Sequence, residues 1–103
     1  MAVRTMENKA AVAALAALAF ETRLEAVQLL ATVGDEGLAA GELSRRLGVQ
    51  QNTLSDHLGA LTRAGILTAE RRSRSIIYRA NPVAVSELIS FLDERCKASA
   101  RAA

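Results

Sequence analysis

The sequence predicts a mainly α-helical domain with one small β-hairpin, in the order α-α-α-α-β-β-α. Half of its 103 residues are apolar and 3% are aromatic, so the core must consist largely of alanine and branched aliphatic side chains. Alanine and leucine favour helices, and apolar residues recur at helical spacing over most of the chain. A short β-branched stretch interrupts this pattern before the last helix. A chain of this length is one domain, residues 1–103.

Two helices are predicted first, from about Glu7 to Ala19 and from about Glu21 to Val33. Each has an apolar stripe at helical spacing. The stripes consist of Val12, Leu15 and Leu18 in the first helix and of Leu24, Val27, Leu30 and Ala31 in the second. The segment 34–37 contains two glycines and two acidic residues and is expected to be a loop.

A pair of helices separated by a short turn is predicted next, over residues 40–64. The first spans about 40–47 and ends at Gly48, and the second spans about 51–64. The second helix has an apolar inner face and a polar outer face, as a helix-turn-helix requires. The inner face consists of Leu54, Leu58 and Leu61.

A β-hairpin is expected directly after this pair. Ile66–Glu70 and Ile76–Ala80 have the composition of strands, and the polar segment Arg71–Ser75 between them contains three arginines. A hairpin with a basic tip after a helix-turn-helix is a wing, here residues 66–80. A last helix is expected over residues 82–98, because a proline is tolerated in the first turn of a helix.

Positive charge is concentrated in the middle of the chain. The net charge is only +2, but residues 43–80 contain seven arginines and two acidic residues, which leaves −3 on the remainder. Such a distribution is expected of a face that binds a polyanion, although a solvated arginine-rich surface explains the charge equally well.

The outer face of the helix 51–64 has side chains suited to duplex DNA. An α-helix fits the major groove, where Gln51 and Asn52 can each form two hydrogen bonds with adenine. Thr53 and Ser55 can bind phosphates or bases. Asp56 is repelled by phosphates and could accept only from a cytosine amino group. The basic residues expected on phosphates or in the minor groove are Arg63, Arg71, Arg72 and Arg74.

His57 is the only histidine and is expected to contact a phosphate or a base from the same helix. No cysteine, histidine or carboxylate cluster at ligand spacing surrounds it, so it does not predict a metal site. The alternative is a histidine that is merely packed beside the wing.

Five segments together resemble one known family. They are Leu18–Leu24, Gly41–Val49, Asn52–Leu58 with its Ser-x-His-Leu pattern, Ala64–Leu67 and Arg74–Tyr78. Over residues 13–96 the chain is similar to the arsenical-resistance repressor (ArsR) family of bacterial winged helix-turn-helix regulators. The resemblance implies a homodimer held together by the first and last helices, about residues 7–19 and 82–98.

The resemblance also implies a transcriptional repressor. The free dimer would bind a partly palindromic operator in double-stranded DNA, and an inducer would release it. Such a protein acts in the cytoplasm, and a single cysteine, Cys96, suits a reducing compartment. No apolar run approaches the length that spans a membrane.

The possible inducer sites differ from those of the relatives. Family members with a metal site in the first helix of the helix-turn-helix have Cys-x-Cys at positions that are Ala39 and Gly41 here. Members with a zinc site in the last helix use histidines there, and this helix has none. Members that bind trivalent arsenic end that helix with adjacent cysteines, and the matching pair here is Cys96 and Lys97.

Three roles for Cys96 stay open. It could fill the dimer interface as a small apolar residue. It could form a two-thiol site for trivalent arsenic, or a disulfide, with Cys96 of the partner subunit. It could also act alone as a redox or electrophile sensor beside Arg95 and Lys97. The last two roles would make it the inducer-sensing residue, and no other cofactor is expected.

Two other classes of function fit the sequence less well. A winged helix used only as a protein-interaction module would show little salt-dependent affinity for DNA, and the clustered arginines argue against it. An enzyme has no support, because no nucleophile with its base, glycine-rich phosphate loop or metal cluster is visible.

Overall fold

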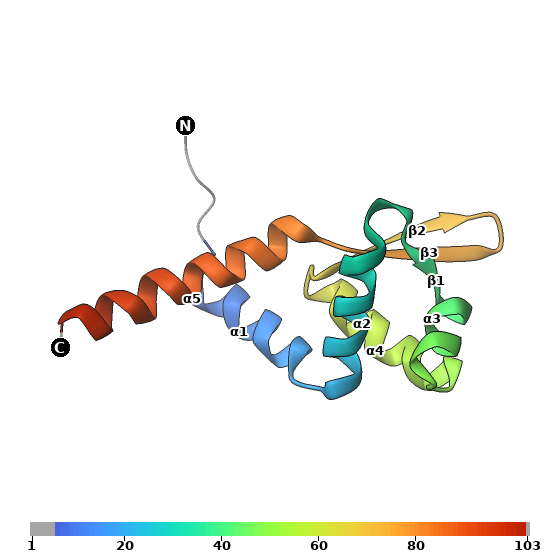
Figure 1. The fold of residues 1–103 in the computed structure, drawn as a ribbon, viewed down its shortest axis with the longest axis horizontal. Coiled ribbons are helices and arrows are strands. Elements are labelled where there is room, and N and C mark those ends of the chain that lie inside the picture. The colour runs from blue at the N-terminus through green and yellow to red at the C-terminus, as the bar shows by residue number, and fades with distance from the viewer. Residues whose placement is uncertain (1–5, 103) are drawn as a thin grey trace.

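The structure, a computed structural model, describes residues 6–102 of the chain, and side chains as far as residue 97. This part contains five α-helices, a short 3-10 helix and three strands (Figure 1). In chain order they are α1 (Asn8–Leu18), α2 (Glu21–Val33), η1 (Gly34–Glu36), β1 (Leu38–Ala39), α3 (Ala40–Leu47), α4 (Gln51–Arg63), β2 (Leu67–Arg72), β3 (Ser75–Ala80) and α5 (Pro82–Ala102).

The winged helix-turn-helix predicted from the sequence is confirmed, and the first four helices agree with their expected bounds to within one residue. The last helix was predicted too short, because it continues past residue 98 to Ala102. Asn81 lies immediately before this helix, and its side-chain amide donates to the Gly65 carbonyl at 3.1 Å. This bond fixes the start of α5 against the turn that follows α4.

The core is built from leucines contributed by α2, α3, α4 and β2. The largest fully buried side chains are Leu30, Leu43, Leu54, Leu58, Leu61, Ile66 and Leu67. In α1 it is small residues that face inward, namely Ala11, Ala14 and Ala17, which allows this helix to lie close to its neighbours. As a consequence, Val12 and Leu15 of the same helix are exposed.

The sheet has three strands rather than two, in the order β1-β3-β2, and all pairs are antiparallel. The strand β1 has no sequence signal, because two residues are too few to show an alternating pattern. It pairs Leu38 with Tyr78 and Ala39 with Ile77. The segment 34–37, expected to be a plain loop, contains η1.

The hairpin also has longer strands and a shorter turn than predicted. Arg72 pairs with Ser75, so the turn consists of Ser73 and Arg74 alone, with Ser73 at φ 57°. A positive φ in a two-residue turn matches the right-handed twist of the flanking strands. Arg71 and Arg72 therefore lie in β2, and the prediction of a polar turn from residue 71 to residue 75 was wrong.

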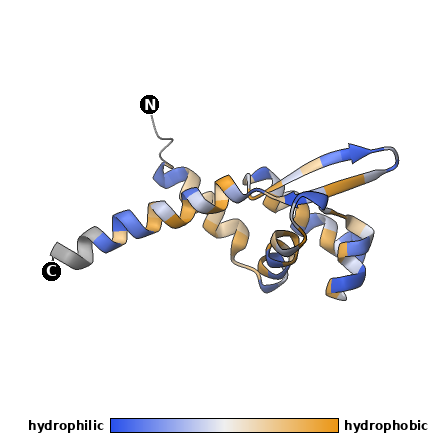
Figure 2. Ribbon diagram, turned by 45° about the horizontal axis from the view of Figure 1, so that its top comes forward, coloured by the Kyte–Doolittle hydropathy of each residue, from blue (hydrophilic) through white to orange (hydrophobic). Residues whose placement is uncertain are grey.

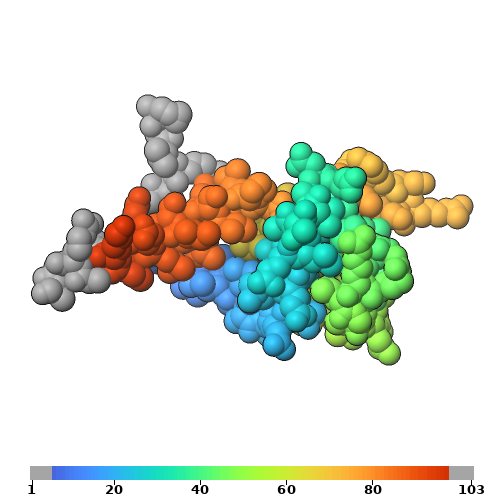
Figure 3. Space-filling view, in the orientation of Figure 1, coloured from blue at the N-terminus to red at the C-terminus, as the bar shows by residue number. Residues whose placement is uncertain are grey.

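The molecule is elongated, with principal extents of 51 × 31 × 22 Å. The hairpin projects at one end and α5 extends at the other (Figure 3). Helix α1 packs against α2, α4 and α5 and so lies between these two ends (Figure 1). None of the helices within residues 6–102 is long and apolar enough to cross a membrane.

Gly37 is a sensitive point of the fold, because its backbone has a φ of 66° and a ψ of −176° beside β3. A Cβ there would lie 2.6 Å from the Tyr78 carbonyl oxygen and 2.8 Å from Cγ of Arg79. A backbone conformation of this kind alone costs a non-glycine residue about 1–3 kcal/mol. Replacing Gly37 with alanine should therefore lower the free energy of unfolding by more than this amount, because the clash adds to it. Gly34 has a φ of 75° and open space around it, so Gly34→Ala isolates the backbone contribution. Urea unfolding should show the larger loss for Gly37→Ala, and equal losses would contradict the predicted clash.

Candidate DNA interface

The turn between α3 and α4 sets the angle of the helix-turn-helix. Gly48 adopts a left-handed conformation with a φ of 69°, and its N–H donates to the Ser44 carbonyl at 2.9 Å. The Val49 N–H donates to the same carbonyl at 3.2 Å, and the Ser44 hydroxyl donates back to the Val49 carbonyl. These bonds close the end of α3 and direct the chain into α4, with Gly48 at the position where glycine is favoured.

The exposed face of α4 presents most of the side chains predicted for DNA. Its opposite face is held in the core by three fully buried leucines. The side-chain Oδ1 of Asn52 accepts a hydrogen bond of 3.0 Å from the Thr53 backbone N–H. The exposed residues are Gln51, Asn52 and Thr53 in the first turn, Ser55 and Asp56 in the second, and Arg63 in the last. The structure therefore brings these six residues together on one helix, accessible to a ligand.

His57 is placed differently from the other predicted residues of α4. It is half-buried, and its Nδ1 accepts a hydrogen bond of 2.9 Å from Nε of Arg23 on α2. Its ring also lies 5.8 Å from the Phe20 ring, between centroids. The structure thus packs His57 against the junction of α1 and α2 and not beside the wing. A contact between His57 and DNA stays a prediction.

Two arginines of α3, which the sequence marks only by their charge, belong to the same surface. Arg45 and Arg46 both donate to the carboxylate of Glu42, and the second bond measures 2.8 Å. The Arg46 hydrogen bond, supported by Arg45, lowers the pKa of Glu42. The first helix of a helix-turn-helix crosses the DNA backbone, which is where such arginines are useful.

The hairpin divides its charged side chains between two faces, because neighbouring residues of a strand point in opposite directions. Glu70 accepts from Arg79 at 2.8 Å and lies 3.5 Å from Nε of Arg72. Hydrogen bonding to Arg79 and the charge of Arg72 lower the pKa of Glu70. Arg71 lies on the other face of β2, opposite Ile76. The predicted wing residues are all exposed. The charge of Arg72 is partly compensated by the Glu70 carboxylate, whereas Arg71 points to the opposite face of the hairpin from Glu70.

Arg79 has a structural role that its sequence context does not reveal. Besides pairing with Glu70, its Nε donates to the Asp35 carbonyl at 2.6 Å. Its side chain is only 23% exposed. Arg79 therefore ties the hairpin to η1 and to the loop before β1. No sequence signal marks this pairing, since the partners are 44 residues apart.

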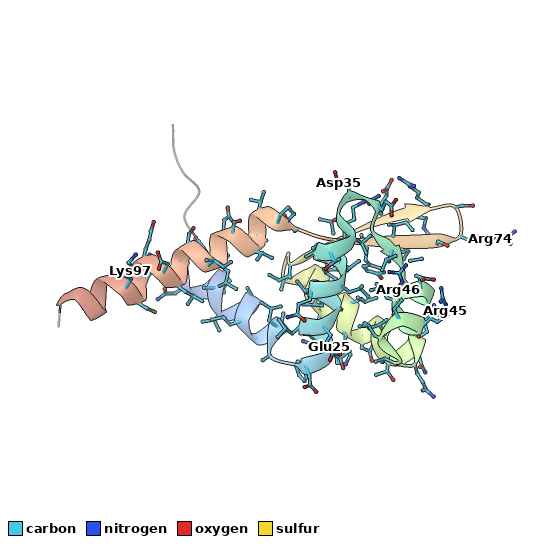
Figure 4. The ribbon with its side chains drawn as sticks, viewed as in Figure 1. Glu25, Asp35, Arg45, Arg46, Arg74 and Lys97 are labelled. Carbon is cyan, nitrogen blue, oxygen red and sulfur yellow. The ribbon has the colours of Figure 1, made fainter. Side chains whose placement is uncertain are left out.

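Basic side chains of α3 and of the hairpin lie at one end of the molecule. Figure 4 shows Arg74 at the tip of the hairpin and Arg45 and Arg46 on α3 at the same end, whereas Lys97 lies near the far end on α5. The N-terminal end of α4 also points to this basic end (Figure 1). The N-terminal end of α4, the α3 arginines and the hairpin therefore lie at one end of the molecule and together form the candidate surface for a polyanion.

Cys96 lies far from this surface, exposed on α5. The two cations beside it in sequence are directed along the helix to other partners. The Arg95 guanidinium stacks over the Phe91 ring at 4.8 Å, and Lys97 Nζ lies 4.0 Å from Asp93. Among the residues that the structure describes, no three histidine, cysteine or acidic side chains lie close enough together to hold a metal ion.

Comparisons with known proteins agree with this geometry. A family model described as a helix-turn-helix domain matches residues 18–70. The transcriptional activator HlyU of Vibrio cholerae is 35% identical over 94 residues, which are 89% of this chain and 84% of that protein. The biofilm growth-associated repressor of Agrobacterium fabrum is 36% identical over 89 residues, which are 84% of this chain and 74% of that protein.

Solved structures extend the likeness to the whole fold. An ArsR-like transcriptional regulator from Rhodococcus sp. RHA1 has a TM-score of 0.78 and 28% identity, over 90% of this chain and 85% of that chain. The transcriptional repressor BigR from Xylella fastidiosa has a TM-score of 0.61 and 31% identity, over 82% of this chain and 85% of that chain. The chain therefore belongs to the ArsR family of winged helix-turn-helix regulators, as its sequence motifs indicated, and it is a DNA-binding transcriptional regulator.

Proposed function

We propose that the protein is a homodimeric repressor that places α4 in the major groove of a partly palindromic operator. The observation that carries this proposal is the separation of two surfaces. The exposed polar face of α4, the α3 arginines and the hairpin occupy one end, and exposed apolar side chains occupy α1 and α5. The first surface suits DNA, and the second suits a second copy of the chain.

The dimer surface of the proposal consists of apolar side chains that one chain leaves in water. Val12 is 64% exposed and Ile89 is 62% exposed, and Leu15 and Leu92 are exposed on the same two helices. Hydrophobic residues recur along α1 and α5 in Figure 2, whereas the outer end of β2 is hydrophilic. Because α1 packs against α5, these side chains can form one continuous surface. Contiguous exposed apolar surface of this kind is typical of an interface.

Base contacts in the proposal come from Gln51 and Asn52, with Thr53, Ser55 and Asp56 on neighbouring bases or phosphates. Arg63, Arg71, Arg72 and Arg74 serve the phosphates or the adjacent minor groove. Repression follows if the operator overlaps a promoter. The relative from Agrobacterium fabrum is named a repressor, whereas HlyU is named an activator, so both outcomes occur among similar proteins. The proposed place of action is the cytoplasm, and no catalytic step is part of it.

The inducer in this proposal acts at Cys96. This thiol lies on the α5 face that also exposes Ile89 and Leu92, so dimerisation could bring it near Cys96 of the partner subunit. Two thiolates would satisfy a soft ion such as trivalent arsenic better than one. Arsenite should then release the reduced protein from DNA, and Cys96→Ser should abolish that release. Release by an oxidant alone would assign the thiol to redox sensing, and binding indifferent to both would leave Cys96 an apolar interface residue.

The proposed function is tested by selecting duplexes from a random-sequence library with the wild-type protein. We expect enrichment of a partly palindromic sequence with half-sites about 10–10.5 base pairs, or a multiple, apart. Fluorescence anisotropy on the selected duplex should show an affinity that falls steeply with salt. Enrichment of no sequence, with weak and salt-independent binding, would favour a protein-interaction module instead.

A further inference from the structure

One arginine outside the candidate surface connects three helices, α1, α2 and α4. Arg23, in the first turns of α2, donates from Nε to Nδ1 of His57 on α4 at 2.9 Å. A terminal nitrogen of the same guanidinium donates to the Ala17 carbonyl, in the last turn of α1, at 3.1 Å. The guanidinium also lies 4.0 Å above the centre of the Phe20 ring. Arg23, His57 and Phe20 are called the α2–α4 clamp below.

The clamp fixes the orientation of the imidazole. A guanidinium has donors only, so Nδ1 of His57 is the acceptor of this bond. The Phe20 ring lies against the same imidazole, tilted by 49°. Two neighbours from one segment of the chain thus hold a side chain of α4 that would otherwise be free to turn.

The remaining described contacts of α4 with its surroundings are largely apolar. Leu54, Leu58 and Leu61 are fully buried against the core. Hydrophobic contact is not directional, whereas a hydrogen bond fixes the direction between its donor and its acceptor. Base recognition, however, needs side chains placed to within about 0.5 Å. A directional bond between α2 and α4 supplies a restraint that the leucines do not.

We infer that Arg23 is a positioning residue for DNA recognition, which sets the rotation of α4 through its hydrogen bond to His57. This inference rests on the proposed function, because it concerns how α4 presents Gln51 and Asn52 to base edges. In it, His57 acts as the acceptor of the clamp and not as a contact to DNA. The clamp also links α4 to the end of α1, a helix of the proposed dimer surface.

The test compares two substitutions of His57 that differ in where they place an acceptor. In His57→Asn the amide oxygen is bonded through Cγ, as Nδ1 is, so it can accept from Arg23. In His57→Gln the oxygen lies one carbon further out and loses that position. Arg23→Lys keeps the charge of Arg23 but cannot donate to His57 and Ala17 while stacking on Phe20.

The probes are the duplex selected by the wild-type protein and a scrambled duplex of the same composition. The measured quantity is the dissociation constant for the scrambled duplex divided by that for the selected duplex. We expect His57→Gln and Arg23→Lys to lower this ratio about tenfold, by weakening only the selected duplex. His57→Asn should keep most of the ratio. The control is Gln28→Ala, which changes an exposed residue of α2 outside the clamp and should keep the ratio.

A merely structural role gives a different pattern, since partial unfolding lowers the affinity for both duplexes alike and leaves their ratio unchanged. Equal loss of the ratio in both His57 variants, with the ratio kept in Arg23→Lys, would show that His57 itself contacts DNA and would overturn the inference. So would a ratio that no clamp variant changes. If the wild-type protein selects no sequence, the proposed function fails and this inference with it.

Discussion

Replacing Ile89 and Leu92 of α5 together with aspartate is expected to convert the protein into a monomer that has lost its operator affinity. Both side chains are apolar and exposed in one chain, and they lie on one side of the helix. Two buried carboxylates at a dimer interface would have to lose their hydration without a partner charge, which opposes association. A monomer binds each half-site separately, and losing the link between two binding modules lowers affinity by about 100- to 10,000-fold.

The matched control for this prediction is Val83→Asp. Val83 is also apolar and exposed on α5, but it lies nine residues from Leu92, two and a half turns away and so on the opposite side of the helix. This variant should remain dimeric in sedimentation velocity and should bind the selected duplex like the wild type. If the Ile89 and Leu92 variant stays dimeric, the interface lies elsewhere. If it is monomeric and binds undiminished, the protein acts on DNA as a monomer.

The helices of this fold could be predicted from the sequence because each carries its own signal. Leucines at helical spacing mark α4, and glycine at its left-handed position marks the end of α3 at residue 48. The strand β1 carries no such signal, since two residues show no period. Its position depends on Gly37, whose backbone passes so close to β3 that only a glycine fits.

The candidate site divides in the same way. Side chains on the outer face of α4 could be predicted because a buried leucine stripe dictates which residues remain exposed. The partners of individual polar side chains could not, because they come from distant segments. Arg23 meets His57 across 34 residues, and Arg79 meets the Asp35 carbonyl across 44. Charge counts treated every arginine alike, whereas the fold assigns some to structure and leaves others to a ligand.

That division of the arginines gives a second large effect, in the hairpin. Replacing Arg71 and Arg74 with alanine is expected to weaken binding to every duplex and to flatten its salt dependence. Arg71 lies on the face of β2 away from Glu70, and Arg74 is at the tip of the turn. If each contacts one phosphate, a dimer loses four contacts. The slope of log K against log salt then falls by about 0.9 for each contact.

Arg72→Ala serves as the comparison, because it removes another exposed arginine of β2. Its Nε lies 3.5 Å from the Glu70 carboxylate, so its charge is partly compensated before DNA arrives. The change in slope per residue should therefore be smaller than for Arg71 or Arg74. Anisotropy titrations at several salt concentrations measure the slopes of the wild type, of the Arg71 and Arg74 double variant and of Arg72→Ala. An unchanged slope in the Arg71 and Arg74 variant would mean that the hairpin does not touch the phosphate backbone.

Glu70→Gln should act in the opposite direction. The amide has nearly the shape of the carboxylate but no charge, so Arg72 is released to a phosphate. Arg79 still donates to the Asp35 carbonyl at 2.6 Å, which keeps the hairpin attached to the loop before β1. Affinity for scrambled duplexes should rise and the salt slope should steepen by up to about 0.9 for each subunit. A weaker variant with an unfolded hairpin would instead assign Glu70 to holding the sheet, and the steeper slope distinguishes competition for Arg72 from that structural role.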